Sequence, residues 1–324
     1  MRIAILDDYF DTIRTLPCFD RLAGHDVTIF TDHAPETDRL AERLRDIEAL
    51  VLIRERTAIT APLLARLPRL RLISQLGPYP HVDVAACTAR GVMLCSNLQP
   101  GAPSIATAEF TWALILAAMR GIPQQVASLR AGAWQCGVGH TLRGRTLGIH
   151  GYGRIGREVA GLGRAFGLDV AIWASEASRQ RARAEGWTLA ASQAALYAES
   201  DIVSLHLRLA DETRHVVTAA DLARMKPSAL LVNTSRAGLI EPGALVAALR
   251  AGRPGMAAID VFEQEPLRDP AHPLLQLPNV LATPHLGYVT HEEYEMQFTE
   301  IFGQIIAYAA GSPINVINPG VSIG

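Results

Sequence analysis

The feature that most constrains the fold of this chain is a glycine-rich turn between a predicted strand and a predicted helix. The run Thr146-Leu-Gly-Ile-His150 has the aliphatic pattern of a buried strand, and Gly151-Tyr-Gly-Arg-Ile-Gly156 follows it at once. Helical periodicity continues from Glu158 to Phe166. A GxGxxG run alone is weak evidence, but a strand before it and a helix after it are the context in which it binds a dinucleotide. The turn therefore predicts a nucleotide-binding domain.

Each glycine of this turn has a separate physical role. Gly151 permits the tight turn, Gly153 lets a pyrophosphate approach the backbone, and Gly156 lets the helix pack close to the strand. The free N–H groups at the start of the helix, where Arg154 and Ile155 lie, then face the phosphate oxygens. A structural turn without a ligand is the alternative.

Short aliphatic runs alternate with amphipathic stretches along most of the chain, in two series. The first series predicts strands at residues 2–6, 27–30, 49–53, 72–74 and 93–95. The second predicts strands at residues 146–150, 169–173, 202–205, 230–233, 256–259 and 280–282. Strands that alternate with helices imply a parallel sheet covered on both faces. We therefore predict an α/β protein with two doubly wound lobes, a flavodoxin-like substrate domain and a Rossmann cofactor domain.

Two helices are expected to connect the lobes. The stretch from Ser104 to Arg120 reads as one apolar helix that carries the chain into the second lobe. The helix at residues 292–310 follows the second series, and we expect it to return to the first lobe. This assigns residues 1–99 and 287–324 to a discontinuous substrate domain and residues 100–286 to the dinucleotide-binding domain.

Composition and charge exclude several function classes. The 324 residues are 49% hydrophobic and 19% charged with a net charge of −2, which is typical of a globular protein without a footprint for nucleic acid or an anionic membrane. The longest apolar stretch, from Trp112 to Met119, is far shorter than a membrane span. The N-terminal residues read as a strand rather than a signal peptide. The four cysteines form no CxxC pair and no histidine has partners at metal-ligand spacing, so we expect a cytoplasmic protein without a metal.

The predicted strand at residues 169–173 leaves the choice between NAD and NADP open. Such a strand ends in an Asp or Glu that binds the ribose hydroxyls when the cofactor is NAD. Here Ala174-Ser175-Glu176 follows, and Ala174 carries no acid. Ser175 and Arg179 can bind a 2′-phosphate, so NADP is at least as well supported as NAD. In the alternative, Glu176 reaches the ribose and the arginines form a solvated helix face.

Three further segments follow predicted strands and carry Arg236, Glu265 and His285. In open α/β sheets ligands bind at this end of the strands. A guanidinium holds a carboxylate bidentately and polarises a carbonyl, and a protonated imidazole gives its proton to the carbonyl oxygen. A carboxylate beside the imidazole stabilises the protonated form and orients the ring. These three groups are what reduction of a 2-keto acid by hydride requires.

Five motifs in order between Leu142 and Gly287 resemble the D-isomer-specific 2-hydroxyacid dehydrogenase family, which includes phosphoglycerate dehydrogenase and glyoxylate/hydroxypyruvate reductase. They are LRGRTLGIHGYGRIG, SLHLRLADETRH, MKPSALLVNTSRAGLIE, AAIDVFEQEPL and NVLATPHLG. The resemblance implies conversion between a small 2-keto acid and its D-2-hydroxy acid, with substrate bound by Arg236 and the His285–Glu265 pair as acid and base. It also implies that Thr234, Asp260 and the backbone near His206 line the nicotinamide pocket. An active site between the lobes and a homodimer built largely on the cofactor domain are implied as well.

The first lobe departs from the family pattern where substrate is expected. Family members carry a Gly-rich loop there, whereas this chain reads Ser74-Gln-Leu-Gly-Pro-Tyr-Pro-His81, and its two prolines remove two N–H donors. Gly77 and Tyr79 are the candidate substrate contacts of this loop. Arg54, in Ile53-Arg-Glu-Arg-Thr57, is a third candidate, which the resemblance favours over Arg56, and a surface salt-bridge cluster is the alternative. The identity of the 2-keto acid stays open.

A second class of function also stays open, a dinucleotide-sensing corepressor on the same fold. The complete set of Arg236, Glu265 and His285 favours an enzyme, because a sensor needs none of these groups for catalysis.

Overall fold

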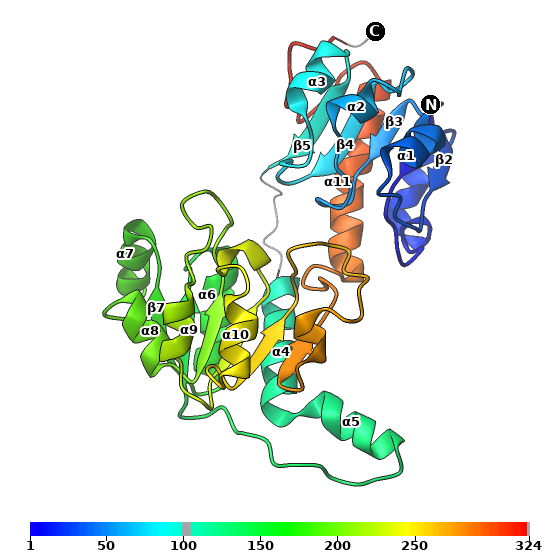
Figure 1. The fold of residues 1–324 in the computed structure, drawn as a ribbon. Coiled ribbons are helices and arrows are strands. Elements are labelled where there is room, and N and C mark those ends of the chain that lie inside the picture. Colours follow the sequence, from blue (N-terminus) through cyan, green and yellow to red (C-terminus); the bar gives the residue numbers. More distant parts are fainter. Residues whose placement is uncertain (99–104, 323–324) are drawn as a thin grey trace. The chain divides into compact units, whose positions relative to one another are not determined.

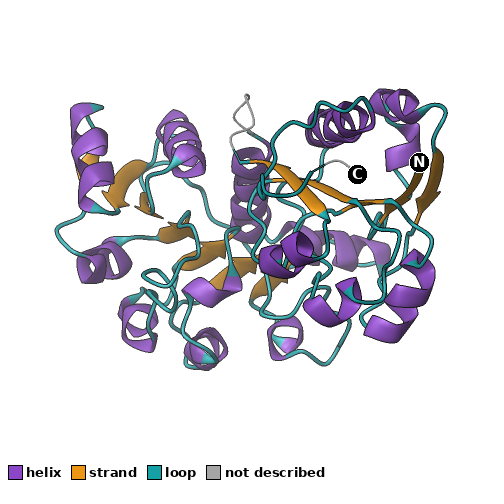
Figure 2. Ribbon diagram, turned by 90° about the horizontal axis from the view of Figure 1, so that it is seen from above, coloured by secondary structure: helices purple, strands orange, loops and turns teal. Residues whose placement is uncertain are grey.

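The computed structural model describes residues 1–98 and 105–322, and the chain divides into two compact units. The first unit comprises Met1–Pro103 and Val289–Gly324, and the second comprises Ser104–Tyr288. Each unit is built on one parallel sheet with helices on both faces, as Figures 1 and 2 show and as the alternation of strands and helices predicts. The predicted boundary between residues 99 and 100, and Ser104 as the start of a helix, lie outside the described residues. No helix of the described residues is long and apolar enough to span a bilayer.

The first unit contains a five-stranded sheet in the order β2-β1-β3-β4-β5. Its strands are β1 (Arg2–Ile5), β2 (Asp26–Ile29), β3 (Ala49–Val51), β4 (Leu72–Leu76) and β5 (Met93–Asn97). Its helices are α1 (Thr37–Leu44), α2 (Ala61–Leu64), α3 (Val84–Ala89) and α11 (His291–Ala309), with short 3-10 helices η1 (Ile13–Thr15) and η2 (Pro17–Leu22).

The two faces of this first sheet are covered by different helices. Successive side chains of a strand point to opposite faces, so neighbouring residues of β4 separate the two layers. Ile73 lies in the hydrophobic core that includes side chains of α1, α2 and α3. The hydroxyl of the next residue, Ser74, donates to the backbone oxygen of Ile301 in α11 (2.9 Å). The last long helix of the chain therefore packs on the N-terminal sheet.

The second unit contains a seven-stranded sheet in the order β12-β11-β10-β9-β6-β7-β8. Its strands are β6 (Thr146–His150), β7 (Asp169–Trp173), β8 (Thr188–Leu189), β9 (Ile202–Leu205), β10 (Leu230–Asn233), β11 (Met256–Ile259) and β12 (Val280–Ala282). Its helices are α4 (Ala106–Arg120), α5 (Ile122–Arg130), α6 (Arg154–Ala165), α7 (Glu176–Ala184), α8 (Gln193–Glu199), α9 (Ala219–Arg224) and α10 (Ala244–Arg250), with η3 (Ala237–Leu239) and η4 (Pro273–Gln276). Six strands have the predicted bounds, whereas β8 was missed because two residues are too short to show a period.

The strand order places a ligand site at the ends of β6 and β9. Side chains of α4 and α6, such as Trp112 and Val159, form the core on one face of the sheet. Side chains of α8, α9 and α10, such as Leu196 and Leu249, form the core on the other. The connections after β6 and β9 therefore leave toward opposite faces. Ligands of open α/β sheets bind where the connections after two neighbouring strands leave toward opposite faces of the sheet.

Candidate active site

The glycine turn after β6 has the geometry that a phosphate-binding turn needs. Gly151 has a φ of +102°, and a Cβ there would lie 2.7 Å from the carbonyl atoms of His206. A Cβ on Gly156 would lie 2.2 Å from the backbone oxygen of Gly151, whereas beside Gly153 there is open space. Arg154, which is exposed, and Ile155 begin α6, whose first N–H groups face the turn. The turn therefore fits a pyrophosphate.

Two histidines lie beside this turn with their rings desolvated. The N–H of His206 donates to the backbone oxygen of His150 (2.8 Å), and Nε2 of His206 is 2.8 Å from the hydroxyl of Ser204. Nδ1 of His150 is 3.0 Å from the hydroxyl of Tyr197. Desolvation lowers the pKa of His206 to about 3 and the pKa of His150 to about 4. Both rings are therefore neutral at neutral pH, and it is the backbone of His206 that packs on Gly151.

The end of β7 presents an acid and a base together. Ala174 is buried, Ser175 precedes the first turn of α7, and Glu176 begins that helix. The guanidinium of Arg179 lies 4.4 Å above the ring of Trp173 and 2.5 Å from Oε2 of Glu176. The two groups between which the sequence left the choice of NAD or NADP are thus paired with each other.

His285 and Glu265 form a direct hydrogen bond, with Nδ1 and Oε2 2.5 Å apart. The other carboxylate oxygen, Oε1, accepts from the N–H of Phe262 (2.9 Å), which fixes the orientation of the carboxylate. Partial desolvation raises the pKa of Glu265, but the hydrogen bond with His285 and the charge of its ring outweigh it, and the pKa lies below its usual value. The ionised carboxylate holds Nδ1 and leaves Nε2 for a ligand.

Arg236 belongs to the same electrostatic cluster. It follows β10 in a turn braced by Asn233, whose Nδ2 donates to the backbone oxygen of Arg236 (3.0 Å) and whose Oδ1 accepts from the N–H of Ser235 (3.0 Å). The positive charge of Arg236 contributes to the low pKa of Glu265. The structure therefore brings Arg236, Glu265 and His285 together within the second unit.

Asp260 anchors the loop that carries His285. Its carboxylate is fully buried and accepts hydrogen bonds from the hydroxyl of Thr283 (2.6 Å) and from the N–H groups of Leu286 (2.8 Å) and Gly287 (2.9 Å). His285 lies between these contacts with a left-handed φ of 56°. Desolvation raises the pKa of Asp260 despite these hydrogen bonds. The sequence analysis assigned Asp260 to the cofactor and missed this anchoring. The only signal for it in the sequence was Thr283, a hydroxyl donor two residues before His285.

Two further contacts position the segments of the cluster. The hydroxyl of Thr234 is 2.8 Å from the hydroxyl of Thr111 in α4, which joins the end of β10 to that helix. The ring of Tyr288 meets the imidazole of His285 edge-on, with centroids 5.7 Å apart. Neither contact was predicted, because each depends on how separate segments approach.

The candidate substrate residues lie in the first unit, after β3 and β4. Arg54 is half-buried and has a left-handed φ of 57°. The N–H of Gly77 is already used, since it donates to the backbone oxygen of Asn97 (2.9 Å), and the ring of Tyr79 packs against the hydrophobic core of the unit. The side chain of Gln75 holds the loop through the backbone oxygens of Gly77 (3.2 Å) and Pro78 (3.1 Å). Across residues 1–98 and 105–322, no group of three or more acidic, histidine or cysteine side chains forms a metal site.

Comparison with known proteins adds an independent observation. The family model described as "D-isomer specific 2-hydroxyacid dehydrogenase, NAD binding domain" matches residues 112–287. Glyoxylate reductase from Aeropyrum pernix is 39% identical over 307 residues, which cover 91% of this chain and 90% of that protein. D-3-phosphoglycerate dehydrogenase from Methanocaldococcus jannaschii is 37% identical over 285 residues, but these are 87% of this chain and 53% of the longer relative. A solved structure of phosphoglycerate oxidoreductase from Vibrio cholerae superposes with a TM-score of 0.92 at 50% identity, covering 96% of this chain and 99% of that one.

Proposed function

This chain belongs to the D-isomer-specific 2-hydroxyacid dehydrogenase family and is an oxidoreductase that acts on the CH–OH group of its donors, and we propose that it interconverts a small 2-keto acid and the D-2-hydroxy acid through Arg236, Glu265 and His285. One observation carries this proposal. A histidine and a carboxylate share a 2.5 Å hydrogen bond close to the charge of an arginine, in the unit whose glycine turn fits a dinucleotide. Nothing in the described part of the chain favours the corepressor alternative.

Each member of the cluster has a separate role during reduction. The guanidinium of Arg236 binds the substrate carboxylate and polarises the keto oxygen. His285 donates a proton from Nε2 to that oxygen, while the ionised Glu265 stabilises the imidazolium before transfer and orients the neutral ring after it. When bound, the reduced nicotinamide supplies the hydride that adds to the carbonyl carbon. In the reverse direction His285 accepts the hydroxyl proton.

The family has an NAD-binding domain, and we propose the residues that hold the cofactor here. Gly151, Gly153 and Gly156 with the start of α6 at Arg154 and Ile155 bind the pyrophosphate. Ser175 and Arg179 bind the adenosine end, and the backbone of His206 with Thr234 and Asp260 borders the nicotinamide. Ala174 carries no acid that would repel a 2′-phosphate, so NADP stays at least as well supported as NAD. A 2′-phosphate would have to displace Glu176 from Arg179.

The relatives suggest the range of substrates. One is named for glyoxylate and two for phosphoglycerate, and we propose a small 2-keto acid from this range. Arg54 is proposed to bind an anionic group of the substrate. Gly77 and Tyr79 are proposed to shape the substrate loop.

We also propose a homodimer formed through the second unit. Helix α5 has no buried residue, and this helix and the segment after it expose large apolar side chains, among them Leu129 (60% exposed), Trp134 (74%) and Val138 (97%). Apolar side chains gathered on one exposed segment are typical of a protein contact. A second copy of the chain is the expected occupant. Light scattering after size exclusion should give twice the 324-residue mass, and Leu129→Asp with Trp134→Ser should give the monomer.

A rate matrix tests the proposed function. Glyoxylate, hydroxypyruvate, pyruvate and 3-phosphohydroxypyruvate are each combined with NADH and with NADPH, and oxidation of the cofactor is followed at about 340 nm, where only the reduced nicotinamide absorbs. We expect turnover with at least one pair, and a D-configured product from every acid other than glyoxylate, whose product has no stereocentre. Binding of the cofactor without turnover of any of these acids would contradict the proposal.

A further inference from the structure

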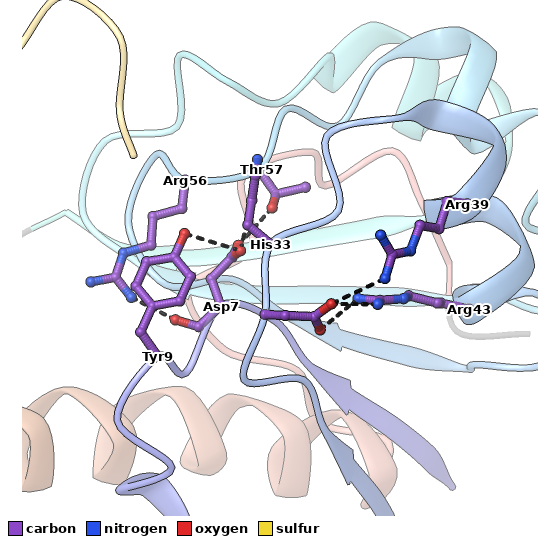
Figure 3. A network of polar contacts seen from close by, with 8 residues as sticks. Asp7, Tyr9, His33, Arg39, Arg43, Arg56 and Thr57 are labelled. Atoms are coloured by element: carbon purple, nitrogen blue, oxygen red, sulfur yellow. Dashed lines mark hydrogen bonds and ion pairs between the residues drawn. The ribbon is translucent and has the colours of Figure 1, made fainter. Parts of the chain in front are cut away.

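A second histidine–carboxylate contact lies in the first unit. Asp7 follows β1, is almost fully buried and has a left-handed φ of 61°. Its Oδ1 is 2.8 Å from Nδ1 of His33 and accepts a longer bond from the hydroxyl of Tyr9 (3.4 Å), and its Oδ2 accepts from the hydroxyl of Thr57 (2.6 Å). Figure 3 shows these side chains converging on the Asp7 carboxylate.

The backbone of Asp7 makes a further contact with the same segment. Its carbonyl oxygen accepts from Nη1 of Arg56 (2.6 Å), and the guanidinium of Arg56 lies 4.5 Å above the ring of Tyr9 (Figure 3). Asp7 therefore binds two residues of the segment from Arg54 to Thr57, one through its side chain and one through its main chain. Arg56 has a structural role in this network.

The segment that Asp7 binds is the one that carries Arg54. On one side of it the N–H of Leu52 donates to the backbone oxygen of Ser74 (3.2 Å), and on the other the N–H of Ile59 donates to that of His81 (2.8 Å). Between these points Arg54 has a φ of 57°, a backbone conformation that residues other than glycine rarely adopt. Such a conformation persists only where the surroundings hold it. The contacts of Thr57 and Arg56 with Asp7 supply that restraint.

We propose that Asp7 is a positioning residue for substrate binding, which holds the segment Arg54–Thr57 so that Arg54 presents its guanidinium to the anionic group of the 2-keto acid. The inference rests on the proposed function, because it takes Arg54 as a substrate contact. Asp7 acts through Thr57 and Arg56 and does not touch the substrate, since both of its oxygens are engaged and its side chain is buried.

The test uses Thr57, since its replacement changes one hydrogen bond and keeps the carboxylate. Thr57→Val retains the shape of the side chain and removes the hydroxyl that donates to Asp7, and Thr57→Ser keeps that hydroxyl. Asp32→Asn is the matched control. Asp32 precedes His33, but its carboxylate pairs with Arg43 (2.6 Å) and Arg39 (3.4 Å) on the surface.

KM and kcat are measured for the 2-keto acid in each variant, together with the melting temperature. Thr57→Val should raise KM about tenfold with kcat within about twofold of the wild type, as expected for loss of one charge-assisted hydrogen bond that acts on binding. Thr57→Ser and Asp32→Asn should keep the wild-type KM. In an Arg54→Met background, Thr57→Val should have no further effect on KM, because the group that it positions is gone.

Two results would overturn the inference. One is a wild-type KM in Thr57→Val, and the other is an independent, multiplicative effect of Thr57→Val in the Arg54→Met background, which a general loss of stability would produce. Both contradict the positioning role alone, since the wild type still turns over. A wild type that reduces no 2-keto acid contradicts the proposed function and this inference with it.

Discussion

Nδ1 of His285 lies 2.5 Å from Oε2 of Glu265. Glu265 follows β11 and His285 follows β12, which are neighbouring strands of one sheet. The carboxylate is fixed from its other side by the N–H of Phe262, and the histidine by a loop that Asp260 anchors. The pair is therefore held from both ends before any ligand binds. A pair held in this way can transfer a proton with little rearrangement, which is what acid–base catalysis requires.

Replacement of the histidine tests the acid. His285→Ala should lower turnover by roughly 10²–10⁴-fold, the usual contribution of a positioned general acid, with cofactor affinity nearly unchanged. Turnover is measured at saturating cofactor, and affinity from the quenching of tryptophan fluorescence. Wild-type turnover in this variant would remove His285 from the mechanism.

Replacement of the glutamate tests the charge of the pair. Glu265→Gln keeps a hydrogen-bonding side chain but removes the negative charge that stabilises the imidazolium. For reduction of the keto acid, the alkaline limb of the pH–rate profile should move to lower pH, because the proton is lost from the pair more easily. The titrations of His285 and Glu265 should be analysed as one coupled system. A profile that superposes on that of the wild type would show that Glu265 has a packing role alone.

The arginine is tested by a change that keeps its charge. Arg236→Lys should lower kcat/KM by about 10–100-fold, because an ammonium group cannot form the two parallel hydrogen bonds of a guanidinium. Steady-state kinetics with the best acid of the rate matrix measures the effect, and Arg224→Lys, on an exposed face of α9, is the control. Kinetics close to the wild type in Arg236→Lys would exclude a bidentate contact.

The second and third glycines of the turn should respond differently to one methyl group. At Gly153 the added Cβ meets open space, so Gly153→Ala should fold normally and lower cofactor affinity, since the methyl occupies space that the pyrophosphate needs. At Gly156 the Cβ meets the backbone oxygen of Gly151 at 2.2 Å, so Gly156→Ala should lower the melting temperature. Calorimetry with and without cofactor separates the two effects. Equal behaviour of the variants would contradict the assignment.

The buried ring of His150 predicts a loss of stability in acid. Its pKa is lowered from 6.5 to about 4 in the folded protein, so between these values the unfolded chain binds the proton and the folded chain does not. The free energy of unfolding should therefore fall by up to about 3 kcal/mol as the pH drops from 6.5 to about 4, and stay level for this group above 6.5.

Urea unfolding at several pH values measures this slope. His150→Gln lacks a titrating group and should show a shallower decline over the same range, whereas His140→Gln, at an exposed position, should follow the wild type. A slope that is unchanged in His150→Gln would assign the acid sensitivity to other groups.

Much of the fold and of the cluster could be predicted from the sequence, because strands and turns leave patterns in short stretches of the chain. The strand before the glycine turn has the predicted bounds, Thr146–His150, since a buried strand shows as a run of aliphatic residues. The glycines of the turn are spaced as the backbone geometry requires, and a Cβ at Gly151 or Gly156 would indeed meet backbone atoms. Arg236, Glu265 and His285 follow strands of one parallel sheet, so the strand pattern alone predicted that they meet at one edge.

Only the tertiary structure decided which partner each polar group takes. Asp260 binds the loop after β12, Asp7 binds Thr57, and the N–H of Gly77 is used by Asn97. Each of these contacts joins residues 20 or more positions apart. A hydrogen bond tolerates a change of only a few tenths of an ångström in its length. A sequence pattern records which residues are buried and which backbone conformations are possible. Hydrogen-bond partners are set by the approach of distant segments, for which no local pattern exists.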